Sequence, residues 1–454
     1  MRPNRIPRIA LALACLVLFR CGPMKYLSAS GRSLVPGRFF LFAAMSSSSI
    51  ASAISSVSPS GSASFPASAA DTPPPAAWVG TYTKGSSRGI YRVPFDFADG
   101  RFGSPELVIE LPSPSFLAFR PASAAGTPAL YAVSESTATV SAFALPAAAA
   151  TTAAAATGSP VPLNSAPTRG AGPCDVAVDA TGRTLAVANY SGGSLAAWRL
   201  ADDGCIEREI AFFQHTHVSR ANPRRQEKPH VHGVTFSPDN RLLLVPDLGA
   251  DRVYVYLHDA AASTLAPHGT APWIELPPGS GPRHAVFSPD ARHFYVINEL
   301  GNTVSAFACD ATAATAATAA TTAATGTGTF APVADVPTLP SGFAGESITA
   351  ELAFSSDGLR LYASNRGHDS IAIFARDPAT GRLTPAGHVS AGGRGPRHFT
   401  LTPDGRWLVV ANQNSGNLAA LRITPGVATA AATSTAAAAA GTLPLDAAVC
   451  VKFR

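Results

Sequence analysis

One stretch decides the fold: HGVTFSPDNRLLLVPDLGADRVYVYLHD (232–259), which returns in close variants along the chain. The same pattern is found in HAVFSPDARHFYVINELGNTVSAFACD (284–310), ELAFSSDGLRLYASNRGHDSIAIFARD (351–377) and HFTLTPDGRWLVVANQNSGNLAALRI (398–423). A further copy begins at Cys174, and a weaker one covers residues 116–145. Internal repetition of this kind predicts an array of similar structural units.

Each repeat has the same local pattern. A short apolar strand is followed by a Pro-Asp-Gly type of turn, in which Pro sets φ and Asp or Gly accepts the tight bend. A second strand, a polar corner and an alternating third strand follow, and a more variable fourth strand completes the sheet. Because no amphipathic helix separates the strands, the pattern excludes a parallel α/β fold and indicates an all-β propeller of four-stranded antiparallel blades.

The seventh blade is split between the two ends of the repeat region. WVGTYTKGSSRGIYRVPFDF (78–97) is expected to supply its inner strands, and VCVKFR (449–454) reads as a returning strand. Pairing of these N- and C-terminal strands would close a seven-bladed ring and remove its free edges. We therefore expect one propeller domain over residues 77–454.

The chain before that domain has a different composition. Residues 1–45 carry basic residues and two apolar runs that resemble a signal peptide, and residues 46–76 form a Ser/Ala/Pro-rich leader expected to be flexible. The second basic and apolar run makes Met24 a candidate start. We expect a periplasmic or secreted protein if this segment is a genuine signal, and a cytoplasmic one otherwise. Ala/Thr-rich tracts at 146–160, 311–329 and 427–441 fall between repeats and are expected to be loose loops.

Composition narrows the function classes. The net charge of +5 originates in the basic leader, and no basic stripe with interleaved aromatics occurs in the repeats, so nucleic-acid binding is not expected. The six cysteines show no CxxC pair, and the sequence has neither an HExxH motif nor a GxSxG elbow. We expect chemistry without a metal or other cofactor, no stable membrane span in the mature chain, and a monomer.

The repeats resemble the seven-bladed lactonase family, which includes propeller-type 6-phosphogluconolactonases and carboxymuconate-lactonising enzymes. The resemblance covers about residues 76–454. It rests on these segments in this order: VGTYT (79–83), HVHGVTFSPD (230–239), DLGADRVYVY (247–256), GPRHAVFSPD (281–290), INELGNTV (297–304), SNRGHDSIAIF (364–374) and GPRHFTLTPDGRWLVVANQNS (395–415). By motif, the residues proposed to act in the lactonising members correspond to His232, Arg283, Glu299 and Arg366.

The residues also point to a common site without the family. His232, His284 and His398 precede the first strand of three repeats and are expected at equivalent points of the channel, with Arg283 and Arg397 one position earlier than the last two. Arginine suits a carboxylate or phosphate because its planar fork donates two hydrogen bonds. We expect His284, Arg397 and His398 to bind an anionic substrate beside the four candidate catalytic residues.

The expected reaction is hydrolysis of a sugar lactone, with 6-phosphogluconolactone as the leading substrate. In that hypothesis Glu299 is the general base, Arg283 and Arg366 stabilise charge, and His232 donates a proton. A muconate-type lactonising cyclase and a non-catalytic binding platform are the alternatives. Arg283 could instead only pair with Glu299, and Asp247 could pair with Arg252 at a corner of one blade.

Overall fold

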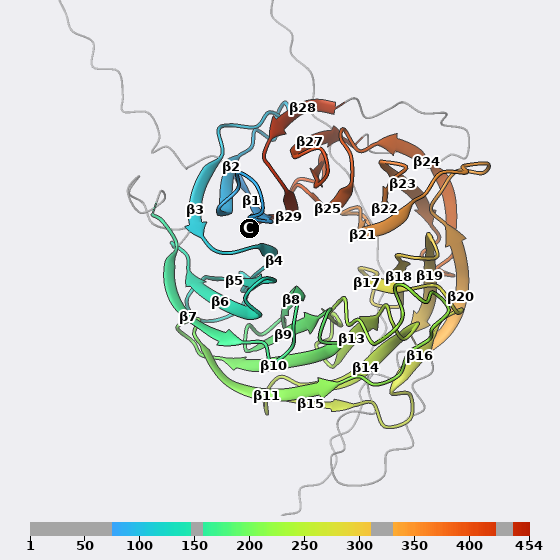
Figure 1. The fold of residues 1–454 in the computed structure, drawn as a ribbon, viewed down its shortest axis with the longest axis horizontal. Helices are drawn as coiled ribbons and strands as arrows, with labels where there is room; N and C mark the ends of the chain where they lie inside the picture. The colour runs from blue at the N-terminus through green and yellow to red at the C-terminus, as the bar shows by residue number, and fades with distance from the viewer. Residues whose placement is uncertain (1–74, 147–157, 310–329, 424–438) are drawn as a thin grey trace, which may run out of the picture. The chain divides into compact units, whose positions relative to one another are not determined.

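The computed structural model describes residues 75–146, 158–309, 330–423 and 439–454. Seven antiparallel sheets succeed one another around a central axis, as Figure 1 shows for the coloured part of the chain. The predicted all-β propeller is therefore confirmed. The leader and most of the three Ala/Thr tracts lie outside the described residues, but the last residues of the third tract begin strand β28 (Ala439–Pro444) rather than a loop.

Six blades are built from consecutive strands, with the first strand of each nearest the channel. They are β4 (Pro114–Phe119), β5 (Ala129–Ser134), β6 (Thr139–Ala144) and β7 (Val161–Pro167); β8 (Pro173–Val178), β9 (Thr184–Asn189), β10 (Ser194–Leu200) and β11 (Ile206–Gln214); and β12 (Thr235–Phe236), β13 (Leu242–Asp247), β14 (Arg252–Asp259) and β15 (Thr264–Pro267). They continue as β17 (Pro282–Phe287), β18 (His293–Asn298), β19 (Thr303–Cys309) and β20 (Phe330–Pro337); β21 (Ile348–Phe354), β22 (Arg360–Arg366), β23 (Ser370–Arg376) and β24 (Leu383–Ser390); and β25 (Pro396–Leu401), β26 (Trp407–Asn412), β27 (Asn417–Arg422) and β28. The third blade has a fifth strand, β16 (Trp273–Glu275), which also pairs with β14.

The turn between the first and second strands is held in the same way in four blades. A Ser or Thr hydroxyl donates to the aspartate two residues later, at 2.5–2.6 Å: Ser237 to Asp239, Ser288 to Asp290, Ser355 to Asp357 and Thr402 to Asp404. Such side-chain bonds fix a tight bend locally. These aspartates therefore form turns, as their place in the repeats suggested.

Blade seven closes the ring with strands from both ends of the repeat region. The order is β29 (Ala448–Phe453), β1 (Ala76–Thr81), β2 (Gly89–Pro94) and β3 (Glu106–Glu110), and β29 pairs antiparallel with β1. Closure by the terminal strands is confirmed. The expected order is wrong, however, because β29 lies against β25 and β4 at the channel and is itself the inner strand.

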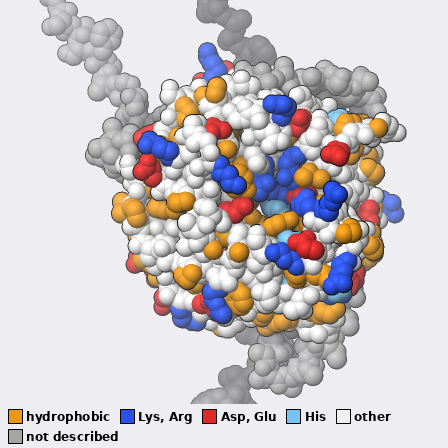
Figure 2. Space-filling model, viewed as in Figure 1, with side chains coloured by type: hydrophobic (Ala, Val, Ile, Leu, Met, Phe, Trp, Pro, Cys, Tyr) orange, Lys and Arg blue, Asp and Glu red, His pale blue; other side chains and the backbone are white. Residues whose placement is uncertain are grey.

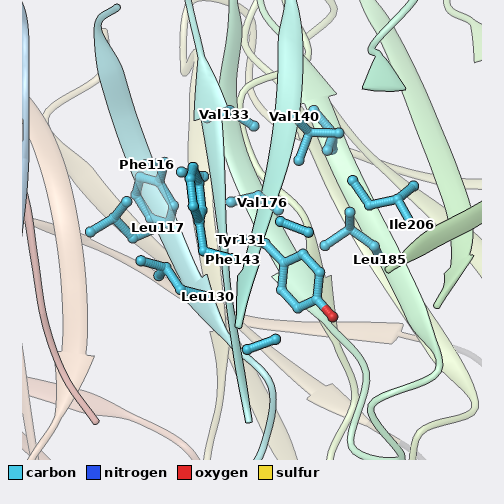
Figure 3. Close-up of a cluster of buried hydrophobic side chains, with 14 of the residues drawn as sticks. Phe116, Leu117, Leu130, Tyr131, Val133, Val140, Phe143, Val176, Leu185 and Ile206 are labelled. Atoms are coloured by element: carbon cyan, nitrogen blue, oxygen red, sulfur yellow. The ribbon is translucent and has the colours of Figure 1, made fainter. Parts of the chain in front are cut away.

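The core lies between successive blades rather than within one sheet. Figure 3 shows one such layer, where Phe116, Leu130 and Tyr131 of the first blade pack toward Val176 and Leu185 of the second. Side chains alternate between the two faces of a strand, so a blade covered on both sides buries nearly every residue of its middle strands. The hydroxyl of Tyr131 is satisfied by donating to the carbonyl of Gly204 at 2.9 Å.

Within the ranges that the structure describes, no helix is long and apolar enough to cross a bilayer.

The closing strand should be essential for stability. Val451 is fully buried and pairs with Val79 across the β29–β1 junction. Val451→Asp would place an unpaired charge in that core, and we expect it to lower the free energy of unfolding by at least about 3 kcal/mol. Val161→Asp is the matched control, because Val161 is 60% exposed on an outer strand; it should change stability by less than about 0.5 kcal/mol. Equal effects in urea denaturation would contradict the assigned closure.

Candidate active site

The site is built where first strands begin and second strands end, because antiparallel neighbours bring these points to one face of the ring. Arg283 is at the start of β17, and Arg366 is the last residue of β22. Glu299 directly follows β18, with its N–H donating to the carbonyl of Gly281 at 2.7 Å. Figure 2 shows Lys and Arg side chains gathered around a hollow at the centre of this face.

A recurring β-bulge aims the channel side chains. The register between first and second strands shifts at Pro282/His284, at Pro396/His398 and at Pro173/Asp175. In each case the residue in between has no partner in the ladder. A bulge of this kind breaks the alternation of the strand and re-aims the extra side chain. Two consecutive residues, such as Arg283 and His284, are therefore both buried at the channel.

The register corrects the predicted equivalence of the three histidines. Thr235, Val286 and Thr400 each pair with the third residue of the next strand, so they occupy equivalent positions. The residues three positions before them are His232, Arg283 and Arg397, which are therefore equivalent to one another. The residue equivalent to His284 and His398 in the third blade is Gly233, not His232. Only glycine fits there, because a Cβ would lie 2.6 Å from the carbonyl oxygen of Arg283.

Glu299 is the centre of a group of side chains that we call the outer layer; its other members at this carboxylate are Arg225, Arg283, Arg366 and His232. Its Oε2 lies 2.8 Å from Nη2 of Arg366, 3.1 Å from Nε of Arg283 and 3.9 Å from Nε2 of His232. Its Oε1 accepts a hydrogen bond of 2.6 Å from Arg225. The structure therefore brings all four candidate catalytic residues together. It also adds Arg225, which the sequence did not single out.

The electrostatics of this layer are set by burial and by the arginines. Burial would raise the pKa of Glu299, but the positive charges of Arg366, Arg283 and Arg225 together hold it well below its usual range. Glu299 is therefore a firmly ionised carboxylate and a weak base.

Burial, and then the neighbouring Arg283, lower the pKa of His232 well below its usual value. Its imidazole is neutral at pH 7. The sulfur of Cys174 lies 3.7 Å from Nδ1 of His232. The thiol proton can be donated to the backbone carbonyl of Val231 or His232, so the sulfur is free to accept a hydrogen bond from Nδ1–H.

Arg397, near the start of β25, completes the outer layer. Its guanidinium lies over the ring of Tyr82, 5.5 Å from the centroid, and the Tyr82 hydroxyl donates to Glu135 at 2.8 Å. Within the described ranges no carboxylate forms an ion pair with Arg397. Its charge nevertheless acts on the pKa of both Arg283 and Arg366. It is therefore a cation close enough to both guanidinium groups to act on them electrostatically.

The two remaining predicted binding residues belong to an inner layer, one position further along the strands. Nδ1 of His284 lies 3.0 Å from Oε2 of Glu351, and Nε2 of His398 lies 3.4 Å from the same oxygen. The ring of Phe116 meets both imidazoles edge-on. Burial would raise the pKa of Glu351, but the two histidines hold it below its usual range. Both histidines hold Glu351, and the His284 ring also contacts the outer layer, with its centroid 5.5 Å from that of the His232 ring.

Arg283 connects the two layers. It contacts Glu299 through Nε and donates from Nη1 to the carbonyl of Ala350 at 2.6 Å. The same Nη1 lies 3.3 Å from both ring nitrogens of His284, which places the guanidinium against the imidazole. The sequence did not indicate Glu351 as a site residue, because the segment ELAFSSD (351–357) is not preceded by a PRH motif.

The expected corner pair of Asp247 and Arg252 is wrong. Asp247 is fully buried and pairs with His215 at 2.8 Å, while Arg252 pairs with Glu275 on β16. Asp247 also accepts N–H groups of His230 and Gly249, so it fixes the segment that leads to His232. Among the described residues no group of three or more His, Cys, Asp or Glu is arranged to hold a metal ion.

Comparisons with known proteins agree with this geometry. A family model described as "Lactonase, 7-bladed beta-propeller" matches residues 76–453. A relative from Bacillus subtilis named 6-phosphogluconolactonase is 31% identical over 344 residues, covering 75% of this chain and 89% of its own. A second of that name, from Formosa agariphila, is 34% identical over 262 residues, covering 57% of this chain and 69% of its own. The structure of a periplasmic gluconolactonase from Pseudomonas aeruginosa has a TM-score of 0.71 and 31% identity, covering 84% of this chain and 98% of its own.

Loss of the Glu299 charge should destabilise the fold in a pH-dependent way. Glu299→Gln leaves Arg283, whose side chain is only 3% exposed, without its carboxylate. We expect a loss of roughly 3–5 kcal/mol at pH 7. Because the folded pKa is depressed, the wild-type advantage exists above the unfolded pKa of about 4.3 and shrinks as pH falls below it.

The control for this measurement is Glu110→Gln. Glu110 pairs with Arg88 at 3.1 Å, but both side chains are 67% exposed. Its loss should cost less than about 1 kcal/mol. Denaturation curves at pH 7 and pH 3.5 would decide the matter, and a Glu299→Gln penalty that does not change with pH would refute the assigned electrostatics.

Proposed function

The chain belongs to the family of seven-bladed β-propeller lactonases, and from this premise we propose that it hydrolyses 6-phosphogluconolactone to 6-phosphogluconate at the Glu299 cluster. The names carried by its relatives cover both the phosphorylated lactone and gluconolactone. The site itself must therefore supply the argument for an anionic substrate.

The charge balance of the outer layer carries the proposal. Four arginines (Arg225, Arg283, Arg366 and Arg397) share the layer with two carboxylates: Glu299, which pairs with the first three, and Glu135, which accepts from Tyr82 and acts on Arg397 electrostatically. With His232 neutral, the layer holds two more positive than negative charges in a largely buried channel. Buried charges are strongly unfavourable without a partner. A phosphate group and the oxyanion of a hydrolysing lactone would provide the missing negative charge.

The contacts favour His232 rather than Glu299 as the general base, which differs from the roles expected from the sequence. Glu299 is engaged by three guanidinium groups and is a poor proton acceptor, whereas His232 is neutral and holds Nε2 within 3.9 Å of Glu299. We assign His232 as the general base. Glu299 then stabilises the imidazolium that forms and positions the arginines, as a buried carboxylate does for a catalytic histidine.

The reaction follows from these positions. His232 removes a proton from water as the water oxygen attacks the lactone carbonyl carbon, and the carbonyl oxygen becomes an oxyanion facing Arg283, Arg366 and Arg397. When the tetrahedral intermediate collapses, the bond between that carbon and the ring oxygen breaks. The departing alkoxide takes the proton from the His232 imidazolium, which leaves a hydroxyl, a carboxylic acid and the neutral histidine.

The direct test is turnover of freshly prepared 6-phosphogluconolactone and gluconolactone by the full chain, measured against their spontaneous hydrolysis. We expect catalysed opening of both and preference for the phosphorylated lactone, because only it brings the additional anion. Absence of catalysis on both would overturn the proposal and turn attention to ring closure of a muconate or to simple binding.

Removal of the proposed base should affect kcat and leave KM nearly unchanged. His232→Gln should lower kcat by about 10²- to 10⁴-fold. His388→Gln is the control, since His388 lies on the outer strand β24 and its Nε2 bonds the carbonyl of Thr338.

Because the pKa of His232 is lowered, wild-type kcat/KM should not decline between pH 8 and about 6.5. An acid limb inside that range, or a His232→Gln enzyme as active as wild type, would contradict the assignment.

A further inference from the structure

The two oxygens of the Glu299 carboxylate serve different partners. Oε2 faces Arg283, Arg366 and His232, which are the groups assigned to the reaction. Among the residues that the structure describes, only Arg225 contacts Oε1, at 2.6 Å. Arg225 thus lies on the other side of the carboxylate from the reacting groups, and it can contact a substrate without disturbing the Oε2 contacts.

Arg225 is also the exposed member of this set. Its side chain is 35% exposed, compared with 13% for Arg366 and 3% for Arg283. Nη2 donates to Glu299 and to the hydroxyl of Tyr190 at 3.2 Å. Nη1 and Nε have no partner among the described residues. A guanidinium with unused donors at the rim of the site can bind a phosphate or carboxylate.

The segment that carries Arg225 is rigidly held, although it lies outside the blade strands between β11 and β12. The next residue, Gln226, is fully buried and donates to the carbonyl of Leu248 and to Oδ1 of Asp251. Its side-chain oxygen accepts from the N–H of Asn222 at 2.8 Å. The backbone at Arg225 is therefore fixed before any ligand arrives, which reduces the entropic cost of binding.

Asp251 links this segment to the strand of Arg283. Its Oδ1 also accepts the N–H of Gly281 at 2.7 Å, and its Oδ2 accepts the N–H of Gly279 at 2.6 Å and the hydroxyl of Ser219 at 2.5 Å. Gly281 lies two residues before Arg283. One buried carboxylate therefore sets the position of Arg225 relative to the reacting groups.

We infer that Arg225 is a specificity-determining residue, which binds the anionic group of the substrate at the end remote from the lactone carbonyl. This inference rests on the proposed lactone hydrolysis and adds to it the residue that distinguishes a phosphorylated lactone from a neutral one. Arg283, Arg366 and Arg397 stabilise the reaction centre, and Arg225 selects the substrate at the rim.

The test compares Arg225→Gln with Arg224→Gln. Arg224 is the adjacent, exposed arginine, so both variants remove one positive charge from the same segment. On 6-phosphogluconolactone, Arg225→Gln should lower kcat/KM by roughly 10- to 100-fold, mainly through a higher KM. On gluconolactone the loss should be clearly smaller, because there only the contact of Arg225 with Glu299 is removed, and the control Arg224→Gln should stay within about threefold of wild type on both substrates. Arg225→Lys should recover part of the preference, because it keeps the charge without the fork.

The outcomes separate this inference from the proposed function. Wild-type catalysis with an equal loss on both lactones in Arg225→Gln would overturn the specificity role and make Arg225 a support for Glu299. Wild-type catalysis with no loss in Arg225→Gln would overturn it as well. Absence of wild-type catalysis on either lactone would instead count against the proposed hydrolysis on which the inference rests.

Discussion

A single buried carboxylate, Glu299, holds three arginines at the channel of this propeller. Without it, Arg283 and Arg366 would repel each other in a region of low dielectric, and the reaction centre could not persist in the absence of ligand. With it, the layer remains positively charged overall, because Arg397 adds a guanidinium without an ion pair in the described part of the chain. The site is thus stable when empty and still attractive to an anion. The same pairing makes Glu299 a weak base and leaves proton transfer to His232.

The propeller fold is what allows these residues to meet. They come from positions far apart in the chain, but first strands begin and second strands end on the same face of the ring. The bulge at the start of first strands adds a second channel-facing side chain where regular alternation would give one. The inner layer around Glu351 then supports Arg283 from below through His284 and the carbonyl of Ala350. Backbone regularity therefore provides the positions, and local irregularity provides the site.

Much of the fold could be predicted because the repeat is explicit: the apolar strands, the Ser/Thr-x-Asp turns and the split blade all appear in the sequence. The order within blade seven could not, because short apolar strands at either terminus fit the inner position equally well. The four motif residues do meet, but the role of Glu299 depends on neighbours from three blades that sequence cannot place. The sequence aligns His232 with His284 and His398, because a glycine at position 233 gives no sign that this residue is the equivalent of those two histidines. Arg225 could not be predicted as a site residue, because it lies in a connecting segment that contains several basic residues.

The central claim is that the charge imbalance of the outer layer creates a specific anion site. Calorimetric titration of the wild-type chain with 6-phosphogluconate and with gluconate tests it most directly, since both products share the sugar chain and differ in the phosphate. The account predicts saturable binding of 6-phosphogluconate to one site per chain, weakened by salt and by Arg397→Gln, and much weaker binding of gluconate. Equal affinity for the two products, or 6-phosphogluconate binding indifferent to Arg397, would contradict it.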